Sequence, residues 1–401
     1  MHSDDLNSID VSSPSIYKDD RWQTLFARLR ADDPVHFCDD SPYGPYWSIT
    51  RFDDIVNVEV DYETFSAEIQ GNKIDDLPPG IRPPTFIRMD PPKHTGQRKT
   101  VAPIAARRNL SHYEVTIRER TKDVINSLPR GQPFNWVSEV STKLTTMMLA
   151  TLFDFPWADR DMLAHWAEVV VADINDENSP VSTEKARLEE LKKMGEYFSS
   201  LWKERQSGPP KLDLLSIMAH SPAMAQMSGM EFIGNIGMLI VAASDTTKNT
   251  MSGGASFVCD HPDEWEKVLK NRNLMPSFVA ETVRYQSAII YFRRTATRDV
   301  NLRGKTIHRG DKVVMWYVSG NRDESAIDEP DKFIADRDKY RHHLGFGAGI
   351  HRCIGDGLAN LQLQALWETV ADQRLQLQLA RPPERIYSNF IRGFREVSVQ
   401  I

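Results

Sequence analysis

Residues 344–359 read L-G-F-G-A-G-I-H-R-C-I-G-D-G-L-A, and this stretch decides the fold. One cysteine, Cys353, follows a loop that carries Gly345, Gly347 and Gly349 and precedes an apolar helical run. Glycine lets the backbone come close to a flat, bulky partner where a Cβ would clash. The backbone N–H groups at the start of the following helix point toward the sulfur and favour a thiolate over a thiol.

Two readings of Cys353 compete with a ligand role. A lone cysteine is most often a small, buried apolar residue. A cysteine hydrolase built on Cys353 and His351 is disfavoured, because residues two apart in a tight loop rarely present a usable nucleophile–base pair. A thiolate held in a tight loop against a planar group is, in contrast, what a haem iron needs as an axial ligand.

Composition narrows the class of protein. The chain has 401 residues, of which 40% are hydrophobic and 26% charged, as in a globular protein with a sizeable core. The net charge of -7 gives no basic balance for nucleic acid. Three scattered cysteines form neither a disulfide framework nor a zinc site and fit a reducing compartment. No signal peptide and no uncharged apolar run of about 18 residues occurs, so we expect a cytoplasmic protein without a membrane span.

The pattern of elements predicts a mainly α-helical chain with small β-sheets. We expect residues 1–16 to form a flexible tail and residues 17–401 a single domain. Short aromatic and β-branched pieces near 35–50 and 300–317 predict β-rich subregions, the first of them a hairpin.

The longest apolar helical stretch runs from Met230 to about Cys259. A helix that is apolar on most sides is buried. It nevertheless contains A-A-S-D-T-T at residues 242–247, which places Asp245 and Thr246 in its middle. Buried polar groups are costly without partners, so these residues need a reason. A satisfied helical bend is the plain alternative, since a threonine hydroxyl can bond the carbonyl one turn back.

Three further motifs are weak alone. They are M-D-P-P-K-H-T-G-Q-R at residues 89–98, E-T-V-R at 281–284 and N-R-D-E at 321–324. His94 and Arg98 lie four apart and share a helix face, which locally suits a solvated surface. Glu281 and Arg284 share a face at spacing three and could form a surface ion pair of small value.

In this order and spacing, the five motifs make the chain resemble a cytochrome P-450, a haem-thiolate monooxygenase, from about Trp22 to the C-terminus. The resemblance implies a triangular prism of helices around a buried haem b, with dioxygen as co-substrate. It implies Cys353 as the metal ligand, and Glu281 with Arg284 as a structural ion pair that Arg337 could join. The residues expected to contact the cofactor are His94, Arg98, Ala243, Arg294, Phe346, Gly347, His351, Cys353 and Gly355.

Within that family the central helix carries an acid and an alcohol that deliver protons, and the matching residues here are Asp245 and Thr246. Many relatives have glycine where this chain has Ala243 and a larger residue at Ser244, so the oxygen-binding bend is expected to be tighter. Among the cofactor contacts, His94, Arg98, Arg294 and His351 supply cations and donors for the two haem propionates.

The electrons must come from elsewhere. The sequence contains no flavin or nicotinamide fingerprint and no cysteine set for an iron–sulfur cluster. We therefore expect electrons from NAD(P)H through separate partners, a [2Fe–2S] ferredoxin and its reductase. A basic docking patch near the cysteine is predicted at Arg107, Arg108, Arg341 and Arg352, although each could be an ordinary solvated charge. We expect a monomer.

The predicted substrate pocket is mostly aliphatic and aromatic, which favours a small apolar substrate. The cysteine loop, L-A-N-L-Q-L and M-S-G-G at 251–254 resemble the soluble bacterial subfamily that hydroxylates alkanes and fatty acids at the chain terminus. Terpenoid or steroid hydroxylation, a peroxide-driven oxygenase and a non-catalytic haem protein remain alternatives. The predicted pocket residues are Ile74, Leu77, Phe86, Met238, Val241, Ala242, Ile289, Ile290, Tyr291 and Phe390.

Overall fold

The computed structural model describes residues 6–76 and 84–401. It is mainly helical with small sheets, which confirms the predicted fold class. The α-helices are α1 Pro14–Lys18, α2 Trp22–Asp32, α3 Phe52–Val60, α4 Lys93–Val101, α5 Arg107–Asn126, α6 Lys143–Phe153, α7 Asp161–Val171, α8 Glu184–Ser207, α9 Leu214–Ala219, α10 Gly229–Asp260, α11 Pro262–Lys270, α12 Met275–Gln286, α13 Tyr317–Gly320 and α14 Asp356–Asp372.

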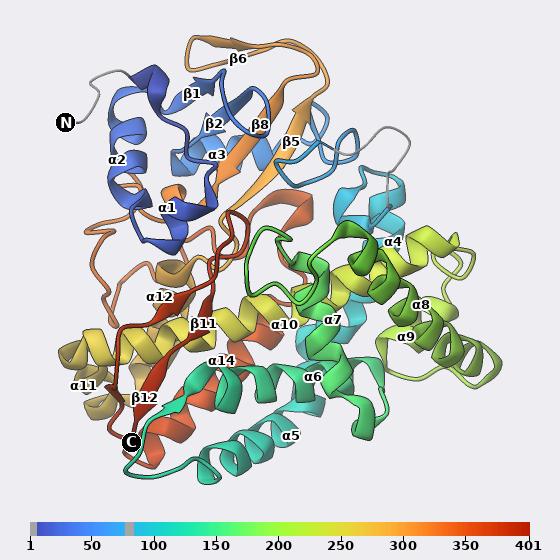
Figure 1. The fold of residues 1–401 in the computed structure, drawn as a ribbon, viewed down its shortest axis with the longest axis vertical. Coiled ribbons are helices and arrows are strands. Elements are labelled where there is room, and N and C mark those ends of the chain that lie inside the picture. The colour runs from blue at the N-terminus through green and yellow to red at the C-terminus, as the bar shows by residue number, and fades with distance from the viewer. Residues whose placement is uncertain (1–5, 77–83) are drawn as a thin grey trace.

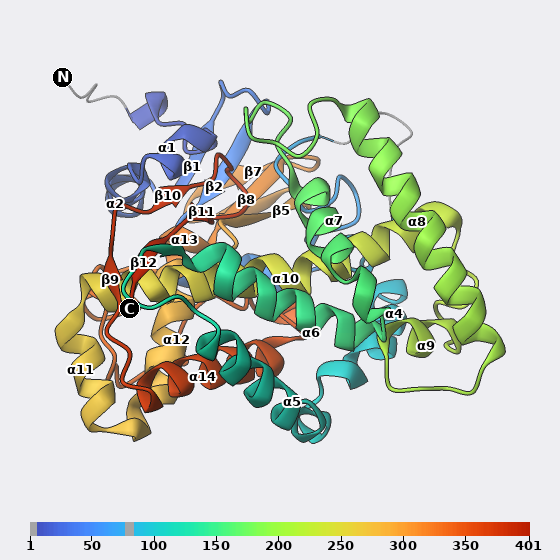
Figure 2. The same ribbon diagram turned by 60° about the horizontal axis from the view of Figure 1, so that its bottom comes forward.

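Helix α10 is the axis of the molecule. It is 32 residues long, and in both views it runs through the middle, with the sheet on one side and α5, α6 and α14 on the other (Figure 1, Figure 2). The Ser228 side chain caps its start by accepting a hydrogen bond from the Glu231 N–H at 3.2 Å. Helices α6, α7, α8, α12 and α14 pack against it. Most of its side chains are therefore buried, as the sequence predicts.

The main sheet lies beside the N-terminal helices and has the strand order β1-β2-β8-β5-β3. Strands β1 and β2 form the predicted hairpin, and β2 pairs in parallel with β8. Both predicted β-rich regions are confirmed. The strands are β1 Val35–Cys38, β2 Tyr46–Ile49, β3 Phe65–Ser66, β4 Phe134–Asn135, β5 Tyr291–Ala296, β6 Val300–Leu302, β7 Lys305–Ile307, β8 Lys312–Trp316, β9 Gln378–Leu379, β10 Glu384–Arg385, β11 Phe394–Glu396 and β12 Ser398–Gln400.

The prediction of a flexible tail over residues 1–16 is wrong for residues 9–16. Ile9, Val11 and Ile16 are buried in the cluster that also holds Trp22. The Tyr17 hydroxyl donates a hydrogen bond to the Val11 carbonyl at 2.7 Å. This segment is polar overall, but its few apolar side chains are spaced so that they reach the core.

The Glu281–Arg284 ion pair is present and fully buried. Arg284 binds Glu281 in a bidentate way at 2.8 and 2.7 Å, and Arg337 adds contacts to the same carboxylate at 2.9 and 3.1 Å. Arg284 also donates to the Asn321 carbonyl at 2.7 Å, and the Asn321 side chain accepts from the Leu344 N–H at 2.6 Å. The pair therefore holds the irregular segment that leads into the cysteine loop.

Candidate active site

The cysteine loop is a tight turn built on two glycines. The Cys353 N–H donates to the Phe346 carbonyl at 2.8 Å, which closes the loop. Gly347 and Gly349 have φ values of 65° and 60°, a region that other residues rarely adopt. A Cβ on Gly349 would lie 2.5 Å from the Glu59 carbonyl oxygen. The backbone of the loop therefore lies directly against the end of α3.

The sulfur of Cys353 lies ahead of α14, as predicted. Its side chain keeps open surface, yet enough protein surrounds the sulfur that burial raises the pKa of the thiol. The Gly355 N–H and the charges of Arg352 and Arg98 act in the opposite direction and lower this pKa. The backbone N–H before α14 therefore lowers the pKa of Cys353, as the sequence predicts, but burial raises this pKa by more. A bound cation would favour the thiolate.

The four predicted cofactor-binding cations and donors lie close to the loop. The rings of His94 and His351 have centroids 4.3 Å apart. Arg98 donates to the Arg352 carbonyl at 2.5 Å. Burial, together with the charges of Arg98 and Arg294, lowers the pKa of His94 to about 4 and that of His351 to about 2. The guanidinium groups of Arg98 and Arg294 therefore both act on the two imidazoles.

The unpaired polar atoms at this place suit a haem. Both ring nitrogens of His94, Nε2 of His351 and Nη2 of Arg294 are buried without a hydrogen-bond partner among the described residues. A buried polar group without a partner costs about 1–3 kcal/mol. The two propionate carboxylates of a haem would provide acceptors for the N–H groups among these atoms. The residues present therefore fit this group.

The middle of α10 presents an accessible face. Ala242 is exposed although the helix is central, whereas Ser244 and Asp245 are buried. The Thr246 hydroxyl donates to the Ala242 carbonyl at 3.0 Å, the bond that the helical-bend alternative requires. Ala243 is partly buried against the core cluster to which α4 to α10 and α14 contribute.

Lys248 was not predicted from the sequence, although its position three residues after Asp245 places the two side chains on one helix face. Its Nζ lies 2.7 Å from Asp245 Oδ1. Burial lowers the pKa of Lys248, but the charge and hydrogen bond of Asp245, together with Glu168, raise it to a larger extent, so the net shift is upward. The acid of the predicted relay is therefore held by a cation on its own helix.

The predicted pocket residues fall into two groups. Met238, Val241, Ala242, Ile289 and Phe390 keep accessible surface. Five others do not face open space or cannot be placed: Ile74, Ile290 and Tyr291 are completely buried in the core beside the N-terminal helices, Phe86 is 5% exposed, and Leu77 lies outside the described residues.

The packing of the first three has a clear cause. The Ile74 N–H donates to the Tyr291 hydroxyl at 3.0 Å, which joins the two segments tightly. In this structure Ile74, Ile290 and Tyr291 offer no surface to a ligand.

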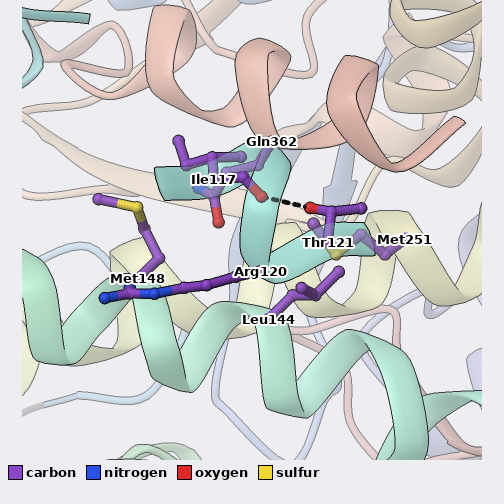
Figure 3. Close-up of a pocket in the computed structure, with 7 residues that line it drawn as sticks. All are labelled: Ile117, Arg120, Thr121, Leu144, Met148, Met251 and Gln362. Carbon is purple, nitrogen blue, oxygen red and sulfur yellow. Dashed lines mark hydrogen bonds between the residues drawn. The ribbon is translucent and has the colours of Figure 1, made fainter. Parts of the chain in front are cut away.

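A small cavity elsewhere takes no part in this site. It has a volume of about 10 Å³, which suffices for one water molecule at most. Figure 3 shows that Thr121 beside it bonds to the Ile117 carbonyl, at 2.7 Å. None of the predicted site residues lines it. Its walls are Ile117, Arg120, Thr121, Leu144, Met148, Met251 and Gln362.

The four arginines of the predicted docking patch differ in exposure and in whether they form ion pairs. Arg108 and Arg341 are exposed and form no ion pair within the described part of the chain. Arg352 is exposed but pairs with Asp356 at 2.6 Å. The side chain of Arg107 lies outside what the structure describes.

Comparison with known proteins decides the family. The family model "Cytochrome P-450" matches residues 45–372. The chain belongs to the cytochrome P-450 family. It is accordingly a haem-thiolate monooxygenase that uses dioxygen and receives electrons from redox partners. Among the described helices, none has both the length and the apolar character that a membrane crossing requires.

Three similar proteins illustrate the range of relatives. The solved structure of cytochrome P-450-153 from Novosphingobium aromaticivorans is 42% identical, with 98% of each chain covered and a TM-score of 0.91. Linalool 8-monooxygenase of Pseudomonas putida is 30% identical over 97% of this chain and 98% of the relative. The methyl-branched lipid omega-hydroxylase of Mycobacterium bovis is 27% identical over 95% and 91%.

Proposed function

We propose that this cytochrome P-450 hydroxylates the terminal carbon of a medium- or long-chain alkane or fatty acid. The observation that carries the proposal is the accessible face of α10, where apolar Val241 and Ala242 adjoin the acid–alcohol pair Asp245–Thr246. An apolar chain can lie against the first two residues while the second two handle protons. The likeness of the cysteine loop to terminal hydroxylases and the relative named as a lipid omega-hydroxylase add support.

In this proposal Cys353 would supply the thiolate that binds the haem iron. His94, Arg98, Arg294 and His351 would bind the propionates, because their donors converge and several of them lack protein partners. Phe346, Gly347 and Gly355 shape the loop around the sulfur, and Ala243 faces the cofactor from α10. A thiolate-bound haem supplies the activation of dioxygen for insertion into a C–H bond.

The chain's own residues then handle protons. The Thr246 hydroxyl is held by the Ala242 carbonyl at 3.0 Å, which keeps it at a fixed place on the accessible face. Asp245 lies behind it, buried and paired with Lys248 at 2.7 Å. We propose that Thr246 donates the proton and that Asp245 replaces it, through water. The presence of both groups argues against a peroxide-driven oxygenase, which needs no such relay.

A second candidate is hydroxylation of a terpenoid. The specific support is the likeness to linalool 8-monooxygenase over almost the whole chain. The two candidates share the site and differ only in the shape of the substrate.

Electrons are proposed to come from a [2Fe–2S] ferredoxin with an NAD(P)H-dependent reductase. The exposed Arg108 and Arg341 offer unpaired positive charge for an acidic partner. Reversing both to glutamate is expected to slow reduction by ferredoxin at low ionic strength, with chemical reduction by dithionite unchanged.

The first experiment is spectroscopic. The reduced carbon-monoxide complex should absorb at ~450 nm through thiolate ligation, and Cys353→Ser should abolish that band. Titration with alkanes, fatty acids, terpenes and steroids then identifies ligands that shift the Soret band, and product analysis locates the hydroxyl group. Hydroxylation only of terpenes or steroids would overturn the linear-chain proposal, and absence of turnover with any reductase system would point to a non-catalytic haem protein.

A further inference from the structure

A buried carboxylate near the cysteine loop has no role in the mechanism above. Glu59 is the penultimate residue of α3, and its side chain is 1% exposed. The Tyr317 hydroxyl donates to its Oε1, and the Ala348 N–H donates to its Oε2. An ionisable side chain is rarely buried so completely unless it is paired or hydrogen-bonded.

The third partner of Glu59 is Arg294. The Nη2 atom of Arg294 lies 3.7 Å from Glu59 Oε1, and both side chains are buried. The Nη1 atom of the same guanidinium donates to the Arg293 carbonyl at 2.8 Å, so the group is held from two sides.

Glu59 also fills the space beside the loop glycines. A Cβ on Gly347 would lie 3.3 Å from Glu59 Oε2, and one on Gly349 would lie 2.5 Å from the Glu59 carbonyl oxygen. The loop that presents Cys353 thus contacts both the backbone and the carboxylate of this residue. Any movement of Glu59 would therefore shift Ala348, which lies five residues before the cysteine.

We propose that Glu59 is a positioning residue that couples the propionate-binding Arg294 to the loop that presents Cys353. One carboxylate oxygen orients Arg294 and Tyr317, and the other fixes the Ala348 peptide. A single side chain therefore contacts both Arg294, the proposed propionate ligand, and the loop that presents Cys353. The inference rests on the proposed roles of Cys353 and Arg294.

The chemistry of the site calls for a carboxylate. Glu59 receives donors on both oxygens, and a carboxylate is an acceptor on both. A glutamine in its place has one acceptor oxygen and one NH₂ group. Whichever way it is turned, the NH₂ group would face either the Ala348 N–H or the Tyr317 hydroxyl and Arg294. Burial raises the pKa of Glu59 by more than Arg294, Tyr317 and Ala348 lower it, so the net shift is upward and these three contacts offset only part of the cost of burying the charge.

The test compares Glu59→Gln with Glu63→Gln, the same change at an exposed glutamate four residues later. The first readout is the rate at which the haem-loaded protein loses haem to excess apomyoglobin. Glu59→Gln should raise this rate about tenfold or more, since hydrogen bonds to charged groups are lost. The second readout is the reduced carbon-monoxide spectrum, in which part of the ~450 nm band should move to ~420 nm as the thiolate is less well held. Glu63→Gln should change neither.

A double-mutant cycle tests the coupling itself. If Glu59 acts through Arg294, the effect of Glu59→Gln on haem loss should shrink at least threefold in an Arg294→Gln background. Tyr317→Phe, which removes one donor and keeps the ring, provides a milder variant if Glu59→Gln folds poorly. It should raise haem loss less than Glu59→Gln does.

Two results would overturn the inference. Additive effects of Glu59→Gln and Arg294→Gln would show that the two residues act independently. A lower melting temperature of Glu59→Gln, with unchanged haem loss and an unchanged spectrum, would show a packing role alone. A wild-type protein that takes up haem without a ~450 nm band would instead contradict the proposed function.

Discussion

Lys248 Nζ lies 2.7 Å from Asp245 Oδ1, one turn further along α10, and both side chains are largely buried. The pair balances charge inside a largely buried helix, and it holds the side chain that we propose to pass protons between water and Thr246. Lys248 is thus expected to fix the position of Asp245.

Replacing Lys248 by methionine should leave Asp245 buried without its cation. Such a loss costs about 3 kcal/mol or more. We expect a lower melting temperature and a lower yield of product per NADH consumed. The control is Lys192→Met, at an exposed position of α8. Coupling equal to that of the wild type would contradict the role of Lys248.

Replacing Thr246 by alanine should leave haem binding intact, because among the described residues the hydroxyl bonds only to its own helix, at 3.0 Å. Loss of the proton donor should divert electrons from product to hydrogen peroxide. Measuring peroxide and product against NADH tests this directly. Thr250 makes the same type of bond at 2.7 Å to the Thr246 carbonyl, so Thr250→Ala is a matched control. An unchanged product yield for Thr246→Ala would rule out the relay.

Glu281 should contribute to the stability of the folded protein and not to the reaction itself, and its contribution should depend on pH. Burial raises the pKa of its carboxyl, but the hydrogen bonds and charges of Arg284 and Arg337 lower it further, to a net value below the usual 4.5. A carboxyl with a depressed pKa stabilises the folded state fully above its unfolded value, and this stabilisation is lost as pH falls through the folded value. Glu281→Gln should therefore destabilise the protein by about 3–5 kcal/mol at neutral pH, and by less as the pH falls below 4.5. Chemical denaturation at several pH values measures this, and a pH-independent difference would contradict it.

Lys73 should distinguish a fatty acid from an alkane as substrate. Its Nζ lies 4.9 Å from the centre of the Phe390 ring, a proposed pocket residue, and burial lowers its pKa to about 8. Below pH 8 the ammonium group would attract the carboxylate of a fatty acid but has nothing to offer an alkane. Lys73→Met should raise KM for a fatty acid about tenfold and leave that for an alkane unchanged. The wild-type KM for the acid should rise above pH 8, and equal effects on both substrates would point to a change in pocket shape.

The sequence predicted those parts of the site that depend on local spacing. The cysteine loop and the helix after it are built from contiguous residues, and Glu281 with Arg284 share a face of one helix. Arg337 could be anticipated because the family pattern supplied the partner. The same spacing of three residues indicates that Lys248 could pair with Asp245. Only the burial of Lys248 in the structure decides that it forms this ion pair and does not extend into solvent.

The remaining parts depend on contacts between distant segments. Nothing in the sequence near Glu59 indicates that its carboxylate meets Ala348, which is 289 residues away. Ile74 and Tyr291 are apolar enough for a pocket wall, but a hydrogen bond between their segments draws them into the core. Residues 9–16 resemble a tail by composition, and their burial depends on the shape of the surface that receives them.

The hydrogen bond from Ala348 to Glu59 also has a consequence for the order of assembly. During synthesis α3 leaves the ribosome long before the loop that it must meet, and contacts of such separation form late and slowly. Arg294 and the two histidines likewise come from distant parts of the chain. The growing polypeptide therefore completes its cofactor-binding set only when nearly all of it has been made, and capture of the prosthetic group belongs to the last stage of folding.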